Sequence, residues 1–198
     1  MKLFLKSLCA AFVLSVIFSV LPFQATCTKL QDEVFRLHIL ANSDSAADQA
    51  LKLKVRDRVL GYTEALFKQA QSKQEAERLV AANLQSIANV AACELRDSGS
   101  DDTVKAEITR MFFTTRRYEN YTLPSGMYDA LRLTIGKGEG HNWWCVMFPG
   151  LCVSSEQSRD AKAKETFTDG EYRVVREEKQ EYKFFIVEFF EKIRATFT

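Results

Sequence analysis

The chain has 198 residues with 27 basic and 26 acidic side chains, so its formal net charge at pH 7 is +1. This balance gives no electrostatic footprint for nucleic acid, because nucleic-acid-binding domains concentrate positive charge on one face. The length beyond the N-terminal segment is that of one ordinary domain, with enough chain to bury a hydrophobic core.

The N-terminal segment has the layout of a secretory signal. Lys2 and Lys6 form a basic start, and residues 7–23 are an uncharged, mostly apolar run. The run is at the short limit for a membrane span, which needs about 20 apolar residues. Residues 1–25 are therefore interpreted as a cleaved signal peptide or as an uncleaved membrane anchor, with a buried helix as a third possibility. The first two interpretations make residues 26–198 an exported domain.

Export changes the interpretation of the cysteines, because an even number of cysteines in an exported chain indicates disulfides. Cys9 lies in the signal segment. The other four are Cys27, Cys93, Cys145 and Cys152. Pro149 and Gly150 lie between the last two and allow the chain to turn back. We therefore predict a disulfide between Cys145 and Cys152; the alternative is two buried free thiols.

The first elements of the domain are predicted to be a strand and two helices. Residues 33–42 alternate apolar and polar side chains, which is typical of a strand. Apolar side chains at spacings of three and four predict a helix over 46–68, with Ser45 as its N-cap. A second helix begins at Ser72 and stops near Gly99. The basic side chains off the apolar stripe of the first helix are expected to be solvated: Lys52, Lys54, Arg56 and Arg58.

The rest of the domain is predicted to contain three strands and a C-terminal helix. Residues 103–113 alternate again, and the strands 130–136 and 143–148 flank a glycine-rich turn, which is typical of a β-hairpin. The polar segment 154–179 is expected to be the least structured part. The order β-α-α-β-β-β-α predicts a single α+β domain in which helices cover a mainly antiparallel sheet.

No catalytic arrangement stands out among the reactive side chains. A cysteine nucleophile needs a histidine base, and a disulfide would remove the Cys145 thiol. A zinc site could combine His38, His141, Cys145 and Cys152, but the spacing of the two cysteines is unusual for zinc ligands. An extracytoplasmic metal-dependent hydrolase that uses His38 and His141 remains an alternative function. We expect no cofactor, no metal and no enzymatic activity.

Two blocks of the sequence are long and specific: FRLHILANSDSAADQALKLKVRDRVL (35–60) and LPSGMYDALRLTIGKGEGHNWWCVMFPGLC (123–152). With the export signal, they resemble the stage II sporulation protein R family of endospore-forming bacteria. The resemblance implies a signalling protein that is made in the forespore and exported into the space that faces the mother cell. Its partner would be a membrane-embedded aspartic protease of the mother cell, which removes the inhibitory pro-sequence of the sigma-E precursor.

The resemblance leaves two points open. The protein is either secreted or tethered to the membrane through residues 7–23, and a membrane-tethered structural protein of the septum is a further alternative. The chain also departs from the family pattern at Gly150, where the family usually has a proline, so the turn before Cys152 is expected to be less rigid.

Two segments are candidates for contact with the protease. Their residues are Asn42, Asp44, His141, Asn142, Trp143 and Trp144. Asn42 and Asp44 lie between a strand and a helix, where the alternative role is helix capping. Adjacent strand residues face opposite sides, so Trp143 and Trp144 cannot both be buried on one face. One of them is a candidate binding hot spot, unless both lie in the core between two layers.

Overall fold

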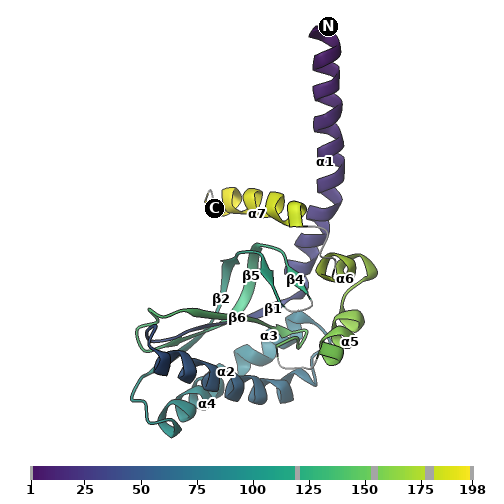
Figure 1. Cartoon of the computed structure of the whole chain (residues 1–198). Helices are drawn as coiled ribbons and strands as arrows, with labels where there is room; N and C mark the ends of the chain where they lie inside the picture. Colours follow the sequence, from purple (N-terminus) through teal and green to yellow (C-terminus); the bar gives the residue numbers. More distant parts are fainter. Residues whose placement is uncertain (1, 119–120, 153–155, 177–180, 197–198) are drawn as a thin grey trace. The chain divides into compact units, whose positions relative to one another are not determined.

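The computed structural model describes residues 2–118, 121–152, 156–176 and 181–196. The chain forms two compact units, and Figure 1 labels most of its elements. Unit 1 consists of Met1–Gln31, Phe112–Gly126 and Phe167–Thr198, and unit 2 consists of Asp32–Met111 and Met127–Thr166. The predicted α+β class is confirmed, since helices accompany a mixed sheet.

The main sheet has the strand order β2-β5-β1-β6. The strand β1 (Phe35–Leu40), one of the two inner strands, pairs parallel with β5 (Gly126–Ile135) and antiparallel with β6 (Asn142–Phe148). The edge strand β2 is Val104–Phe113. The predicted hairpin between the last two strands is therefore wrong, because β1 lies between them. The loop after β5 bonds to the residues that follow β1 instead of closing on itself.

Three helices follow β1, and Figure 1 shows α2 and α4 side by side along one side of the sheet. They are α2 (Ala46–Phe67), α3 (Lys73–Ala82) and α4 (Leu84–Asp97). The Ser45 hydroxyl accepts a hydrogen bond from the Asp48 backbone N–H at 3.1 Å, as predicted for the first N-cap. The predicted second helix is divided at Asn83, whose side chain donates to the Leu79 carbonyl at 2.8 Å.

The alternation predicted for β1 is confirmed. Phe35, Leu37 and Ile39 are fully buried in the core beneath the helices, and their neighbours Arg36 and His38 point to the opposite face. The rest of this core includes Val55, Val59, Leu60, Val80, Ile87, Ala91, Leu95, Leu131, Leu133, Ile135, Cys145 and Met147. Residues of β1, α2 and β6 all contribute to this core. The core therefore fixes where α2 and β6 lie relative to the loop that leaves β1.

The segment 154–179, expected to be the least structured, contains two helices. They are α5 (Glu156–Thr166) and α6 (Asp169–Arg176), while residues 154–155 and 177–179 lie outside the described residues. Sparse apolar side chains anchor them, since Ala163 of α5 and Val174 and Val175 of α6 are buried. The Glu171 carboxylate also accepts a hydrogen bond from the Thr168 N–H at 2.8 Å, which forms a capping box at the start of α6.

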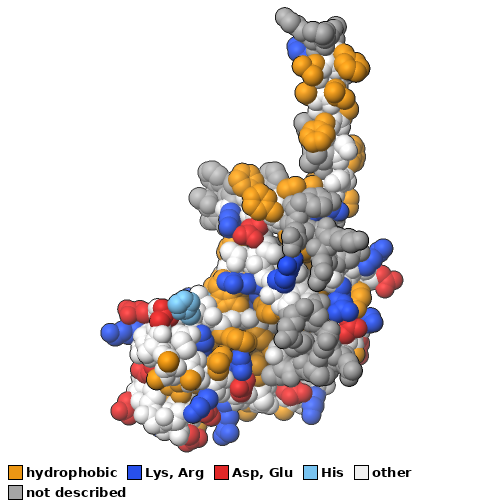
Figure 2. Space-filling view, in the orientation of Figure 1, with side chains coloured by type: hydrophobic (Ala, Val, Ile, Leu, Met, Phe, Trp, Pro, Cys, Tyr) orange, Lys and Arg blue, Asp and Glu red, His pale blue; other side chains and the backbone are white. Residues whose placement is uncertain are grey.

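Unit 1 is built around α1 (Lys2–Glu33), whose first half exposes large apolar side chains such as Phe4 and Phe12 (Figure 2). No helix in the described part of the chain is long and apolar enough to cross a membrane. Further along α1, Phe23 packs edge-to-face on Phe184 of α7 (Glu181–Thr196), with ring centroids 5.1 Å apart. The predicted C-terminal helix is confirmed, while the signal or anchor role of residues 1–25 stays a prediction.

Two short strands complete unit 1. β3 (Arg116–Arg117) pairs antiparallel with β4 (Thr122–Leu123). The side-chain amide of Gln31, in α1, donates to the Ser125 carbonyl at 2.9 Å and so ties the helix to the segment after β4.

Cys27 is expected to resist alkylation in the folded protein. Its side chain is fully buried on α1, and burial, with a smaller contribution from Glu191, raises the pKa of its thiol to about 12. Since the thiolate is the reactive form, iodoacetamide at mildly alkaline pH should label Cys93 on α4, which is half-buried, well before Cys27. Peptide mapping by mass spectrometry measures this, with labelling in denaturant as the control. Equal labelling of the two thiols in the native chain would contradict the packing of α1.

Candidate functional site

The candidate site is formed by two loops that lie far apart in the sequence. One loop, residues 41–45, leaves the end of β1 and leads into α2. The other, residues 136–142, connects β5 to β6 and includes the first residue of β6. Because β1 pairs with both β5 and β6, the two loops meet at the same end of the sheet. We refer to residues 41–45 and 136–142 as the paired loops.

Hydrogen bonds join the paired loops along their backbones. The Gly140 N–H donates to the Ala41 carbonyl at 2.9 Å, and the Glu139 N–H donates to the Asn42 carbonyl at 3.2 Å. The Asn42 side-chain oxygen accepts a third bond from the Lys137 N–H at 3.0 Å. Each bond satisfies a polar group that the end of the sheet would otherwise leave without a partner.

Two glycines make this close approach possible. A Cβ atom on Gly136 would overlap the Asn42 side chain, and one on Gly140 would overlap the Ser43 carbonyl. Gly136 also has φ = +53°, in the left-handed region that favours glycine. The glycine-rich stretch, expected to be a plain hairpin turn, thus lets one backbone lie directly against another.

Asp44 and His141 form the exposed part of the paired loops. The Asp44 carboxylate accepts a hydrogen bond from the His141 N–H at 2.6 Å and pairs with the His141 Nδ1. These hydrogen bonds hold the pKa of Asp44 below its usual value. The side chains of Asp44 and His141 are 56% and 78% exposed, so both are open to a partner while their position is fixed.

A buried lysine on α2 supports this pair. Lys52, expected to be solvated, is buried, and its ammonium donates to the His141 carbonyl at 2.8 Å and to the Gln49 side chain at 2.6 Å. Burial lowers the pKa of Lys52. Lys52 lies off the apolar stripe of α2, and this position predicts a solvated side chain. The prediction is wrong because the carbonyl that Lys52 binds belongs to a loop 89 residues away in the sequence.

Asn42 has a structural role in this arrangement. Its amide group donates to the Asp48 carboxylate at 3.1 Å, and the Ser43 hydroxyl donates to the same carboxylate at 2.5 Å. The bond from Ser43 is the main cause that lowers the pKa of Asp48. Both polar ends of the Asn42 amide are engaged within the protein, so Asn42 positions the loops, and Asp44 is the better placed of the two for a partner.

Asn142 lies at the start of β6 and is exposed. Its side-chain oxygen is 2.8 Å from the Nε2 of His38, a buried side chain on β1. Burial lowers the pKa of His38. His38 and His141 thus have different partners, Asn142 and Asp44.

The two tryptophans face opposite sides of the sheet, as predicted. Trp143 lies opposite Ile39, packs against the helix-covered core and carries the Arg56 guanidinium over its ring at 4.3 Å. Trp144 lies opposite His38, whose ring meets it edge-on at 5.6 Å. Both tryptophans are half-buried, so neither is a fully exposed hot spot and neither lies wholly in the core.

A family profile described as stage II sporulation protein R matches residues 31–158, well over half of the chain. The chain belongs to the stage II sporulation protein R family. Stage II sporulation protein R of Bacillus subtilis (strain 168) is 35% identical over 146 residues, which are 69% of this chain and 65% of that relative. The matched part is thus slightly less than two thirds of the relative's length. No solved structure matches the chain.

The part that matches the stage II sporulation protein R profile includes both paired loops and the predicted disulfide. Cys145 and Cys152 are bonded, with Cα atoms 5.6 Å apart, so the prediction is confirmed. Both thiols are consumed, which contradicts the zinc site built on them and removes Cys145 as a nucleophile. Among the residues that the structure describes, no group of three or more His, Cys, Asp and Glu side chains is placed to hold a metal ion.

Proposed function

We propose that this protein is an exported signalling protein of endospore formation. It acts on a membrane-embedded aspartic protease of the mother cell and so promotes removal of the pro-sequence from the sigma-E precursor. Membership of the stage II sporulation protein R family supports a role in sporulation. The observation that carries the proposal is the exposed Asp44–His141 pair, held on a fixed scaffold within the part of the chain that matches the family.

The compartment in the proposal follows from two features. A disulfide between Cys145 and Cys152 suits an oxidising environment outside the cytoplasm. The basic and apolar N-terminal segment suits export from the forespore, followed by secretion or tethering. Both features support an extracytoplasmic location of the paired loops, which the proposed contact with the protease requires.

The paired loops suit a ligand that activates by binding. A ligand shifts a protease toward its active state only if it binds that state more tightly than the inactive one. Loops that are already joined by hydrogen bonds lose little conformational entropy on binding. More of the contact energy is then available to favour the active state of the protease over the inactive one. Asp44, His141 and Asn142 supply the polar contacts, and the half-buried Trp144, two residues after Asn142 on the same face of β6, supplies apolar surface next to them.

Reconstitution tests the proposed function. The protease and the sigma-E precursor are co-expressed in a host that lacks sporulation genes, with and without the full chain, and precursor cleavage is followed by immunoblot. We expect cleavage only with the full chain. His141→Ala should reduce cleavage about tenfold, the size of a loss at a strong interface contact.

The matched control is Lys105→Ala, because the Lys105 side chain is 71% exposed on β2 and lies outside the paired loops. Circular dichroism shows whether each variant is folded. Cleavage that proceeds without this protein would refute the signalling role. Equal cleavage with the His141 and Lys105 variants would refute the paired loops as the contact.

A further inference from the structure

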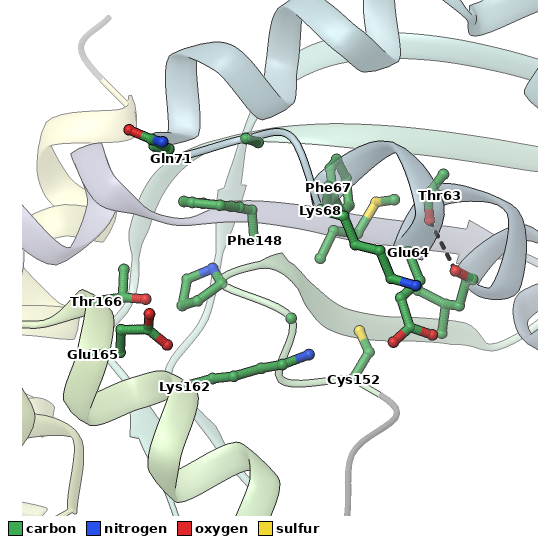
Figure 3. A pocket seen from close by; sticks show the side chains of 15 residues that line it. Thr63, Glu64, Phe67, Lys68, Gln71, Phe148, Cys152, Lys162, Glu165 and Thr166 are labelled. Carbon is green, nitrogen blue, oxygen red and sulfur yellow. Dashed lines mark hydrogen bonds between the residues drawn. The ribbon is translucent and has the colours of Figure 1, made fainter.

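A pocket of about 780 Å³ lies at the other end of β6, beside the disulfide. Its walls come from the end of α2, from α5 and from the turn between Met147 and Cys152 (Figure 3). This volume falls in the range of about 300–1,000 Å³ that is typical of ligand sites. The paired loops contribute no residue to its lining, so the pocket is a separate site.

The pocket has an aromatic wall. The rings of Phe67, near the end of α2, and Phe148, at the end of β6, meet edge-to-face with centroids 6.4 Å apart. Leu60, Met147 and Pro149 extend the apolar lining. Such a wall favours a large apolar group on the ligand, because burying apolar surface is the main source of binding free energy.

One basic side chain crosses this apolar space. Lys162 extends from α5 into the pocket, with Phe67 and Phe148 on its opposite side (Figure 3). Its ammonium group lies next to Gly150, 3.0 Å from where a Cβ atom of that residue would be. Lys162 is half-buried and makes no hydrogen bond or ion pair with any residue that the structure describes. A partly buried cation beside apolar walls is stabilised by an anion that enters with the ligand.

The rim of the pocket restricts which anion fits. Glu64 and Glu165 are exposed at the rim, together with one further cation, Lys68. Two carboxylates at the entrance repel a polyanion such as nucleic acid or an anionic lipid surface. This repulsion grows with the charge of the ligand, so a single carboxylate attached to an apolar body is repelled much less than a polyanion and can pair with Lys162.

We propose that this pocket binds a peptide segment of a protein partner in which an acidic side chain adjoins a large apolar one. The carboxylate pairs with the Lys162 ammonium, and the apolar side chain packs on Phe67 and Phe148. This binding site is independent of the proposed function, because it uses none of the paired loops.

Binding of a defined peptide tests the pocket. The probe is a short fluorescent peptide, acetylated and amidated at its ends, that contains Asp-Phe, and binding to the full chain is followed by fluorescence anisotropy. We expect saturable binding, weakened about tenfold when the peptide carries Asn-Phe or the protein carries Lys162→Gln, since a charged hydrogen bond is lost. Lys164→Gln is the matched control, because Lys164 lies on the same helix outside the pocket lining.

A charge exchange separates recognition from a change in folding. Lys162→Glu should lose the Asp-Phe peptide and gain binding to a Lys-Phe peptide, while thermal melting reports that the variant is folded. A third peptide with a free C-terminal carboxylate and no acidic side chain should bind more weakly than Asp-Phe. The proposal is overturned if the unaltered chain shows no saturable binding, if the two glutamine variants bind alike, or if the charge exchange fails in a folded variant.

Discussion

Gly140→Ala is expected to lower the free energy of unfolding by about 3 kcal/mol, at the upper end of the cost of overpacking. Gly140 is buried between the paired loops, and an added Cβ atom would overlap the Ser43 carbonyl. The overlapping atom belongs to the backbone, which cannot rotate away as a flexible side chain can. The loops must therefore separate, with loss of the hydrogen bond from the Gly140 N–H to Ala41.

Gly61→Ala is the matched control for this substitution. Gly61 lies within α2, and nothing stands within 4 Å of where its Cβ atom would be. Alanine there should raise the free energy of unfolding by about 0.5–1 kcal/mol, because it favours the helix and restricts the unfolded chain. Urea denaturation measures both variants. The packing of the paired loops would be wrong if Gly140→Ala were neutral or stabilising.

Removal of the disulfide is expected to have an effect of similar size. The double variant Cys145→Ala/Cys152→Ala should lose about 2.5 kcal/mol, the value that loop-closure entropy predicts for a bond between residues seven apart. Alanine keeps the buried Cys145 position apolar, so the loss reports mainly the cross-link.

Reduction of the unaltered chain provides an internal control. Unfolding in dithiothreitol should bring the unaltered chain close to the stability of the double variant, and dithiothreitol should leave the double variant unchanged. Equal stability of the oxidised unaltered chain and the double variant would show that the bond does not support the fold. Loss of the bond should also weaken Asp-Phe peptide binding, because Cys152 lines the pocket.

The two candidate sites lie at opposite ends of one strand. β6 begins at Asn142, the last residue of the paired loops, and ends at Phe148, in the aromatic wall of the pocket. Its middle is held by antiparallel pairing with β1 and by the burial of Cys145 and Val146. The strand therefore gives both candidate sites a common rigid support.

Local features were predictable from the sequence because their causes are local. The helix after Ser45 follows from a cap and a stripe at helical spacing, and the alternation around Leu37 follows from the two faces of a strand. The Cys145–Cys152 bond follows from a short, turning connection between two cysteines. The capping box of Thr168 and Glu171 is also a local signal for a helix. The polar composition of residues 154–179 instead predicted little structure there.

Contacts between distant segments were decided only by the tertiary structure. The six residues between Ile135 and Asn142 suit a hairpin, but they also suit a crossing over one intervening strand, and no local signal separates the two. The apolar β1 takes the central place because both of its edges can then be paired within the core. That choice brings Asp44 to His141 and buries Lys52, so the candidate site arises from strand order, which depends on the whole sheet.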